Sequence, residues 1–324
     1  MLTFIFACSM IAEQLGDPAD STDKTQIVVT IPKGTNPRSL GKVLAKHNVI
    51  DSADSFTNYV RITKEGSCLK AGRFSLSRSL SAAEIIKKVC GAPLANDKAF
   101  TVVEGWRIRE IDAALAEQGW ITAGSYADLA TQPGQFKSSY PLPSNTLEGY
   151  LYPETYMLSV DHFDPKKFIQ RQLDTLSKVF ITPNKESIES SGRSLNELMI
   201  VASMVEREEP KDQNMPLVSG IIWKRLDSGW NLGIDATSHY TLEDWNDRKG
   251  LLRQLRDKSD PYNTRLRQGL PPTPIGAPGI NALNATLSPE PSEYWYYLHD
   301  SSQTIRPARN AKEHEQNRRT YNVY

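Results

Sequence analysis

The sequence has no excess of charge of either sign. Its 324 residues carry 38 basic and 38 acidic side chains, so the formal net charge at pH 7 is zero. Proteins that bind nucleic acid usually present a basic surplus, so this balance argues against a nucleic-acid partner. Hydrophobic residues make up 39% of the chain and charged residues 23%, which is typical of a folded globular protein and not of a disordered one.

Cysteine and histidine are too few and too scattered to indicate a metal site. There are three cysteines and five histidines, and none of them are grouped at the spacing of zinc ligands. We therefore expect no metal and no cofactor. Cys68 and Cys90 are expected to be unpaired thiols packed as small hydrophobic groups. If the chain is exported, the alternative is a disulfide that closes a loop of 22 residues between them.

Long hydrophobic runs are also missing. No apolar run reaches the roughly 20 residues that a helix needs to cross a bilayer. Residues 2–12, LTFIFACSMIA, are apolar but short, and no Lys or Arg precedes them. We interpret them as part of a secretory signal or of a membrane anchor that begins upstream, with a hydrophobic terminus packed on the protein as the alternative. Membrane contact is expected only through such an anchor.

Strand and helix patterns predict an α+β protein of about two domains. Residues 1–24 are expected to be a short apolar N-terminus and a linker. Residues 25–98 show the order strand, helix, helix, strand, helix of a small module, and residues 99–324 are expected to form a larger mixed α+β domain. Seven of the 20 prolines fall between 261 and 291, which predicts a long ordered loop that forms the wall of a site.

A helix predicted over residues 194–208 carries two candidates for acid chemistry. A Ser-x-x-Glu capping box opens it and Pro210 ends it. Glu206 and Glu208 lie in its last turn, about 200° apart around the axis at 100° per residue, so both cannot point into one narrow cleft. The negative end of the helix dipole raises a carboxyl pKa there, as a general acid near neutral pH requires. A solvated side chain, or one paired with Arg207, is the alternative interpretation.

Tyrosines accompany other candidate polar residues. Residues 148–156, EGYLYPETY, place two carboxylates among three tyrosines, whose rings and hydroxyls suit sugars. Asp235 is expected in a loop after the helix that ends near Gly229, and residues 262–264 open the proline-rich loop. Packing of these tyrosines in a core or an interface is the alternative.

Five segments occur in a fixed order along the chain: FTVVEGWRIREI, LEGYLYPETY, IVASMVEREE, SGIIWKRLDSGWNLGIDATSHY and YNTRLRQGLPPTPIGAPGINAL. Together they resemble the MltG (YceG-like) family of endolytic murein transglycosylases. The segments IPKGTNPRSLGKVLAKHNVI and LKAGRFSLSRSLSAAEII are similar to the LysM-like region of that family. The resemblance therefore spans about residues 26–320 and implies a small LysM-like N-terminal module followed by a catalytic domain.

The resemblance also implies a set of site residues. The family's catalytic Glu is the second acid of the pattern Ala-Ser-x-(Ile/Val)-Glu-x-Glu, which residues 202–208 match, so the role falls on Glu208. Other matching positions are expected to line the glycan cleft, and these are Glu148, Tyr152, Asp235, Thr237, Tyr262, Asn263 and Thr264. The chain departs from the family's usual Asn-Thr-Tyr, where it has Arg265 in place of the tyrosine.

The activity implied by the resemblance is cleavage, without water, of the β-1,4 bond between MurNAc and GlcNAc in nascent glycan strands. Glu208 would serve first as general acid and then as base, leaving a 1,6-anhydroMurNAc end and terminating strand elongation. Expected partners are peptidoglycan strands and cell-wall synthases, at the outer face of the inner membrane or in the extracytoplasmic space. The alternatives are a hydrolytic muramidase that uses Glu148 or Asp235 with water, and a non-enzymatic module that binds peptidoglycan or a synthase.

Overall fold

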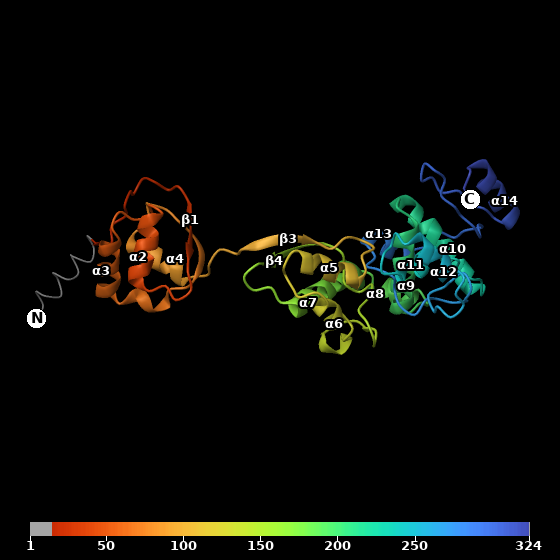
Figure 1. Ribbon diagram of the computed structural model, residues 1–324, viewed down its shortest axis with the longest axis horizontal. Coiled ribbons are helices and arrows are strands. Elements are labelled where there is room, and N and C mark those ends of the chain that lie inside the picture. Colours follow the sequence, from red (N-terminus) through yellow and green to blue (C-terminus); the bar gives the residue numbers. More distant parts are fainter. Residues whose placement is uncertain (1–14, 324) are drawn as a thin grey trace, which may run out of the picture. The chain divides into compact units, whose positions relative to one another are not determined.

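A computed structural model describes residues 15–323, which form a mixed α+β protein. The chain divides into two compact units, residues 1–98 and 99–324, with the boundary inside strand β3 (Asp97–Thr101) (Figure 1). The apolar segment 2–12 lies outside the described residues. Within the described part of the chain, no helix is long and apolar enough to span a membrane.

The first unit is built on a two-stranded antiparallel sheet. Strand β1 (Ile27–Ile31) pairs with β2 (Gly72–Leu76), and Val29 lies opposite Phe74. Both of these side chains are buried, whereas Val28, the neighbour of Val29, is 45% exposed. Because successive side chains of a strand point to opposite faces, only one face of this sheet enters the core.

Helices complete the core of the first unit. They are α2 (Pro37–Lys46), α3 (Ala53–Thr63) and α4 (Ala82–Cys90), with a 3₁₀ turn, η1 (Glu65–Cys68), after α3. A capping box opens α4, with Ser81 and Glu84 bonded reciprocally. The apolar faces of the helices pack with the sheet around one cluster that includes Leu40 and Ile85.

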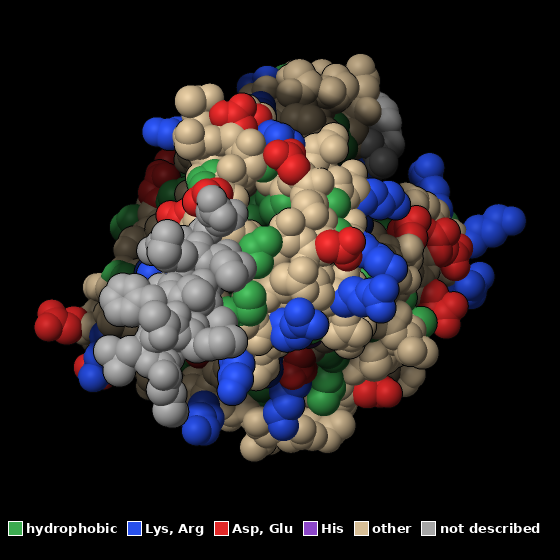
Figure 2. Space-filling view, turned by 90° about the vertical axis from the view of Figure 1, so that its left-hand side faces the viewer, with side chains coloured by type: hydrophobic (Ala, Val, Ile, Leu, Met, Phe, Trp, Pro, Cys, Tyr) green, Lys and Arg blue, Asp and Glu red, His purple; other side chains and the backbone are tan. Residues whose placement is uncertain are grey.

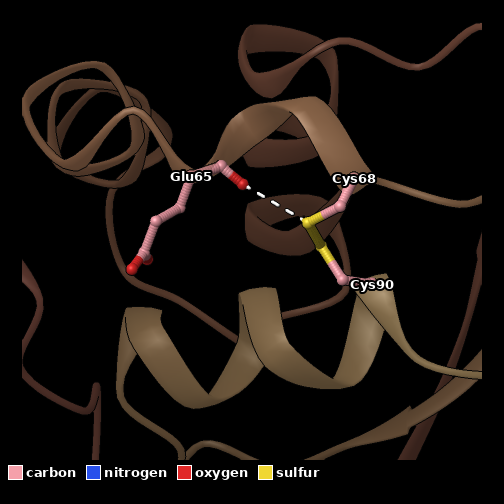
Figure 3. The surroundings of a disulfide bond; sticks show 3 residues. All are labelled: Glu65, Cys68 and Cys90. Carbon is pink, nitrogen blue, oxygen red and sulfur yellow. Dashed lines mark hydrogen bonds between the residues drawn. A yellow bond between two sulfur atoms is a disulfide. The ribbon is translucent and has the colours of Figure 1, made fainter.

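A disulfide joins η1 to the end of α4. Cys68 and Cys90 are bonded, with their Cα atoms 5.1 Å apart (Figure 3). The prediction of two unpaired, packed thiols is therefore wrong, and the reason is that Cys68 lies on an exposed turn that cannot bury a thiol. Its sulfur also lies 3.6 Å from the carbonyl oxygen of Glu65. Because a disulfide sulfur carries no proton, this approach is a contact and not a hydrogen bond.

The second unit contains two hydrophobic clusters. The first surrounds a two-stranded sheet of β3 and β4 (Thr155–Ser159) and includes α5 (Ile108–Glu117), α6 (Ser125–Ala130) and α7 (Pro165–Leu176). Helix α7 passes at Ser177–Ile181 into a π-helical turn, whose wider hydrogen-bond ring interrupts the α pattern.

The second cluster brings together the helices that position the candidate site. These are α9 (Leu195–Glu208), α10 (Met215–Asp227) and α13 (Ile280–Leu287) (Figure 1). Met199 and Ala202 of α9 belong to the first cluster, whereas Val201 and Val205 belong to the second. Since both sides of α9 are buried, the helix is fixed between the two clusters and its C-terminal turn has a defined position.

The remaining described elements are η2 (Pro133–Gln135), α8 (Lys185–Ser190), η4 (Asp212–Asn214), α11 (Asp235–Tyr240), α12 (Arg248–Gln254) and α14 (Ala311–Thr320). They are short apart from α14, and one of them, α11, contributes Ala236 to the second cluster. Residues 261–279 contain no helix or strand, as their proline content predicts. The predicted loop over 261–291 is nevertheless too long, because α13 occupies Ile280–Leu287, where the sequence has no proline.

The two units carry opposite net charges. Residues 1–98 contain 13 basic and 9 acidic side chains, a net charge of +4, and residues 99–324 contain 25 basic and 29 acidic side chains, a net charge of −4. Figure 2 shows Lys and Arg side chains spread over the visible face, with only small separate hydrophobic patches. The neutral balance of the whole chain is thus the sum of a basic and an acidic unit.

Candidate functional site

Helix α9 presents Glu208 from its last turn. The predicted capping box is present at the other end: the Ser194 hydroxyl accepts from the backbone N–H of Glu197, and the Glu197 carboxylate accepts from the backbone N–H of Ser194. Glu209 adopts an extended conformation directly before Pro210 and so ends the helix. Glu208 is therefore the last helical residue, on a helix that is fixed at both ends.

The carboxyl of Glu208 is partly buried and accepts a hydrogen bond from a tyrosine. The hydroxyl of Tyr297 donates to Oε2 of Glu208 over 2.9 Å. Burial raises the pKa of Glu208 and the charge of Asp235 raises it further, whereas the Tyr297 hydrogen bond and the charges of His299 and Arg225 lower it. The helix dipole was the expected cause of a raised pKa, but loss of solvation is the main one. A carboxyl that keeps its proton toward neutral pH can act as a general acid.

The neighbouring carboxylate holds the segment that carries Tyr297. Glu209 is completely buried, and Nε2 of His299 donates to its Oε2 over 2.9 Å. The rings of Tyr297 and His299 meet edge to face with their centroids 6.1 Å apart. Because a buried carboxylate requires hydrogen-bond partners, this pair fixes residues 297–299 against the end of α9 and so orients the Tyr297 hydroxyl.

Asp235 and Arg265 form an ion pair whose charges both act on Glu208. Nη2 of Arg265 lies 2.8 Å from Oδ2 of Asp235, and its Nε donates to Oδ1. The side chain of Arg265 is 50% exposed and that of Asp235 is 39% exposed, so solvent and ligands can reach both. Asp235 was expected in a loop, and this is wrong: it begins α11. That helix has only six residues, too few for a periodic pattern to reveal it in the sequence.

Arg225 reaches the same region from α10. Its Nε and Nη2 donate to the carbonyl oxygen of Trp295 over 2.8 and 2.6 Å, and its Nη1 donates to the carbonyl oxygen of Leu232. Burial lowers the pKa of Arg225, and the charge of Glu208 partly opposes this effect. All the hydrogen-bond acceptors of the guanidinium among the described residues are therefore carbonyl groups, so no ion pair there neutralises its charge.

Three of the polar residues expected in the cleft bond within the chain. Asn263, Thr264 and Thr237 are each at most 3% exposed. The Thr264 hydroxyl accepts from the backbone N–H of Ile234 over 3.0 Å and lies 3.1 Å from the Thr237 hydroxyl. The Asn263 amide oxygen accepts from the backbone N–H of Arg265 over 3.1 Å. These residues join the loop that carries Arg265 to the segment that begins α11.

A second group of polar residues surrounds Glu148. Its carboxylate is 4% exposed and accepts from the backbone N–H of Ile108 over 3.2 Å and from the hydroxyl of Tyr240 over 3.1 Å. Burial raises the pKa of Glu148 to about 7. The ring of Tyr262 packs 4.8 Å from that of Tyr240, and the Tyr262 hydroxyl lies 2.8 Å from the hydroxyl of Thr273. Glu148 and Tyr262 are thus brought together through Tyr240.

Tyr152 belongs to neither group of hydrogen-bonded residues. Its side chain is buried in the first hydrophobic cluster, and its carbonyl oxygen accepts from the hydroxyl of Tyr156 over 2.8 Å. Burial raises the pKa of Tyr152. Its visible contribution is therefore packing under the segment that carries Glu148.

Glu206 contacts a different part of the chain from Glu208. Its Oε2 accepts from the backbone N–H of Gly279 over 2.9 Å, at the start of α13. Burial raises the pKa of Glu206 to about 7, and the charge of Glu104 contributes. The side chain of Glu104 also lies against Gly279, where a Cβ atom would meet its carboxyl group. Glu206 therefore holds the end of the proline-rich loop.

Sequence reasoning missed three residues beside Glu208, namely Tyr297, His299 and Arg225. Tyr297 lies 89 residues after Glu208, in the run WYYLH at 295–299. Such a dense aromatic run with a histidine was the available signal. No local pattern indicates that the charge of Arg225 on α10 acts on Glu208.

Within residues 15–323, no group of three or more His, Cys, Asp or Glu side chains could hold a metal ion. What the arrangement can do is donate and accept a proton at one carboxyl, beside an exposed ion pair and a second, carbonyl-bonded guanidinium.

Comparisons with known proteins agree on one family. The model of the YceG-like family matches residues 29–320. A Bacillus subtilis protein named endolytic murein transglycosylase is 26% identical over 96% of this chain and 89% of its own length. A Streptococcus pneumoniae protein of the same name is 25% identical over 93% of this chain. The chain spans 59% of the length of that pneumococcal relative.

A solved structure resembles the chain as well. The crystal structure of a yceG-like protein from Listeria monocytogenes superposes with a TM-score of 0.60 at 25% sequence identity. The match covers 90% of this chain and 99% of the Listeria chain. The likeness therefore includes nearly all of the fold described above.

Proposed function

The chain belongs to the YceG-like family, and we propose that it is an endolytic lytic transglycosylase of peptidoglycan. The names of the Bacillus and Streptococcus relatives support this activity. The observation that carries the proposal is the carboxyl of Glu208, which is partly buried, accepts from Tyr297 and has a raised pKa. We assign the catalytic role to this carboxyl.

The proposed reaction needs one proton carrier and no water. Protonated Glu208 donates to the oxygen of the glycosidic bond between MurNAc and GlcNAc as the bond from that oxygen to the anomeric carbon breaks. The carboxylate then accepts the proton of the MurNAc C6 hydroxyl, whose oxygen bonds to the anomeric carbon. The products are a free GlcNAc hydroxyl and a 1,6-anhydroMurNAc end, and Glu208 regains its proton.

Tyr297 and Asp235 set the proton affinity of Glu208 in opposite directions. The Tyr297 hydroxyl stabilises the carboxylate that forms after the first proton transfer, whereas the Asp235 charge favours the protonated acid. We propose that Asp235 and Arg265 also contact the glycan, because they are exposed beside Glu208. Thr237, Asn263 and Thr264 then act by holding this pair in place.

Glu148, Tyr262 and Tyr152 are proposed to shape the cleft. The Glu148 carboxylate is buried against Ile108 and Tyr240, so it supports a tyrosine surface on which sugar rings can pack. Of these residues, Tyr262 is partly exposed and is the one best placed to contact sugar.

A hydrolytic muramidase is the second candidate, and it is less well supported. Hydrolysis with inversion needs a second carboxylate that activates water. Both oxygens of Asp235 bond to Arg265, and the oxygens of Glu148 bond to Ile108 and Tyr240. Neither carboxylate is free to take a proton from water without breaking these contacts.

The products of digestion test the proposal. Purified protein is incubated with isolated peptidoglycan, and the released muropeptides are identified by mass spectrometry. We expect 1,6-anhydroMurNAc ends, which are lighter by one water than the reducing ends left by hydrolysis, and we expect none from Glu208→Gln. Only reducing ends would establish the muramidase, and binding without turnover would establish a non-enzymatic module.

The first unit and the cellular location follow from the same proposal. We propose that residues 25–98 form a LysM-like module that binds glycan and that the enzyme acts outside the cytoplasm, at the inner membrane if residues 2–12 are part of an anchor. The Cys68–Cys90 disulfide supports an oxidising location. Cutting nascent strands there would terminate their elongation and place the enzyme near cell-wall synthases.

A further inference from the structure

A surface pocket of about 510 Å³ is lined by two arginines whose charges interact with the proposed catalytic carboxyl. It is lined by Arg225 of α10, by Arg265 and Leu266 of the proline-rich loop, and by Trp230 and Tyr296. Tyr296 precedes the tyrosine that bonds to the catalytic carboxyl, and both arginines are close enough to that carboxyl to feel its charge. An anionic ligand in this pocket would therefore contact side chains whose charges interact with the catalytic carboxyl.

The pocket has an uncompensated positive charge when the catalytic acid is protonated. The charge of Arg265 is balanced by Asp235. Arg225 donates to carbonyl groups and forms no ion pair within the described residues. With Glu208 neutral, as the first proton transfer requires, one positive charge remains at the pocket wall.

Arg265 also keeps donors free for a ligand. Its Nε and Nη2 bond to Asp235, whereas its Nη1 has no hydrogen-bond partner among residues 15–323. The backbone of Arg265 is held in place, because the Asn231 side chain donates to its carbonyl oxygen over 2.7 Å. A guanidinium fixed in this way can bind a carboxylate with little loss of side-chain entropy.

Apolar and aromatic surface accompanies the charge. Trp230 is 41% exposed and Leu266 is 42% exposed, and both line the pocket. The ring of Trp230 packs 4.5 Å from that of Trp295 and 6.0 Å from that of Tyr296. Rigid aromatic rings beside a cation suit a ligand with both C–H surface and an anionic group.

We propose that this pocket is a subsite for a carboxylate on the muramoyl side of the substrate, bound by Arg265 and Arg225. The inference rests on the proposed function, which supplies a substrate with two sources of that group. One is the lactyl ether of MurNAc, which is a free carboxylate when no peptide is attached. The other is the peptide stem, which carries its own carboxylates but converts the lactyl group to an amide.

Binding to an inactive protein tests the subsite without cutting the ligand. The Glu208→Gln protein carries a neutral side chain in place of the protonated acid, and its affinity for soluble glycan strands is measured by calorimetry at pH 7. Three strand preparations are compared: strands with intact stems, the same strands with stem carboxylates converted to amides, and strands freed of stems by an amidase.

The expected result depends on the source of the carboxylate. If the stem supplies it, intact strands bind about 10-fold more tightly than amidated strands, the effect of one charge-assisted contact. If the lactyl group supplies it, the stem-free strands bind about 10-fold more tightly than both other preparations. In either case Arg265→Gln in the inactive protein reduces the difference to about 2-fold, and Arg265→Lys retains most of it.

Arg267→Gln is the matched control. It removes the same charge two residues further along the loop, from an exposed side chain that does not line the pocket, and should preserve the full difference. The subsite is overturned if all three strand preparations bind equally, or if the preference survives Arg265→Gln. Failure of the proposed function has a separate readout, because it appears in the digestion products of the native protein.

Discussion

The hydroxyl of Tyr297 and the carboxyl of Glu208 are joined by a hydrogen bond of 2.9 Å. The bond connects the last turn of α9 to a segment 89 residues later in the chain. It stabilises the ionised form of a carboxyl whose burial favours the neutral form. A residue that must give and then take back a proton needs both influences, because either alone would favour one half of the reaction.

Replacement of each acid in the last turn of α9 separates catalysis from loop support. Glu208→Gln should lose at least about 3 kcal/mol of transition-state stabilisation, more than 100-fold in kcat/KM, as expected for loss of a general acid. Glu206→Gln should cost far less, because an amide oxygen can still accept from Gly279. Turnover of soluble strands measures both. Equal losses would remove the basis for assigning the acid to Glu208.

Tyr297→Phe should shift the pH profile toward alkaline pH. Without the hydroxyl the pKa of Glu208 rises, since that hydrogen bond lowers it. The alkaline limb of kcat/KM, where the acid loses its proton, therefore moves to higher pH. At the optimum we expect kcat to fall about 5- to 10-fold, the effect of one hydrogen bond to the carboxylate. If the alkaline limb does not move in this variant, it reflects the titration of a group other than Glu208.

Asp235→Asn should shift the same limb in the opposite direction. The charge of Asp235 raises the pKa of Glu208, so its removal lowers that pKa and brings the alkaline limb to lower pH. The unpaired Arg265 adds to this effect. Asp227→Asn, on the same unit but paired with Arg193, is a control that should leave the limb in place.

The buried carboxylate of Glu148 should make the protein less stable at high pH. The pKa of Glu148 is about 7 in the folded protein and near its ordinary value in the unfolded chain. The contribution of this carboxyl to the free energy of unfolding is therefore fully present below its ordinary pKa. That contribution is lost as the pH rises through 7. Between pH 5 and 8 this loss is about 2 to 3 kcal/mol of unfolding free energy. Urea unfolding should show a smaller pH dependence for Glu148→Gln, and an unchanged dependence would contradict the assignment.

Removal of the disulfide should destabilise the first unit. Cys68→Ala with Cys90→Ala opens a loop of 22 residues, and we expect a loss of about 3 kcal/mol in the unfolding free energy of that unit. A reductant should lower the stability of the native protein by a similar amount and leave the double variant unchanged. A reductant effect on the double variant would point to another cause.

The scaffold of the site could be predicted from local sequence signals. The capping box at Ser194 and Pro210 mark both ends of α9, and the prolines between 261 and 278 exclude regular structure from that loop. These features depend on neighbouring residues alone. Helix α11 could not be predicted, because one and a half turns are too short for periodicity to appear.

The surroundings of Glu208 could not be predicted, because they depend on long-range contacts. Tyr297 bonds to that carboxyl, and the charges of Arg225 and Arg265 act on it from two other segments. Nothing in the local sequence indicates these relationships. The Cys68–Cys90 pair is a similar case, since 22 residues of spacing allow either a bond or two thiols. Family resemblance located Glu208, whereas only the fold indicates what sets its proton affinity.

Within the part of the chain that the structure describes, the guanidinium of Arg225 donates hydrogen bonds only to carbonyl groups. Its charge therefore links ligand binding in the pocket to the pKa of Glu208. Its charge lowers the proton affinity of Glu208 while the pocket is empty. An anion bound next to Arg225 offsets part of its positive charge. The pKa of Glu208 is therefore higher in the complex than in the free protein. By thermodynamic linkage, protonation of Glu208 increases the affinity for the anion by the same factor. We expect strand binding to be accompanied by proton uptake, because the pKa of Glu208 is higher in the complex than in the free protein. The substrate thus promotes the protonated form of the group that cleaves it.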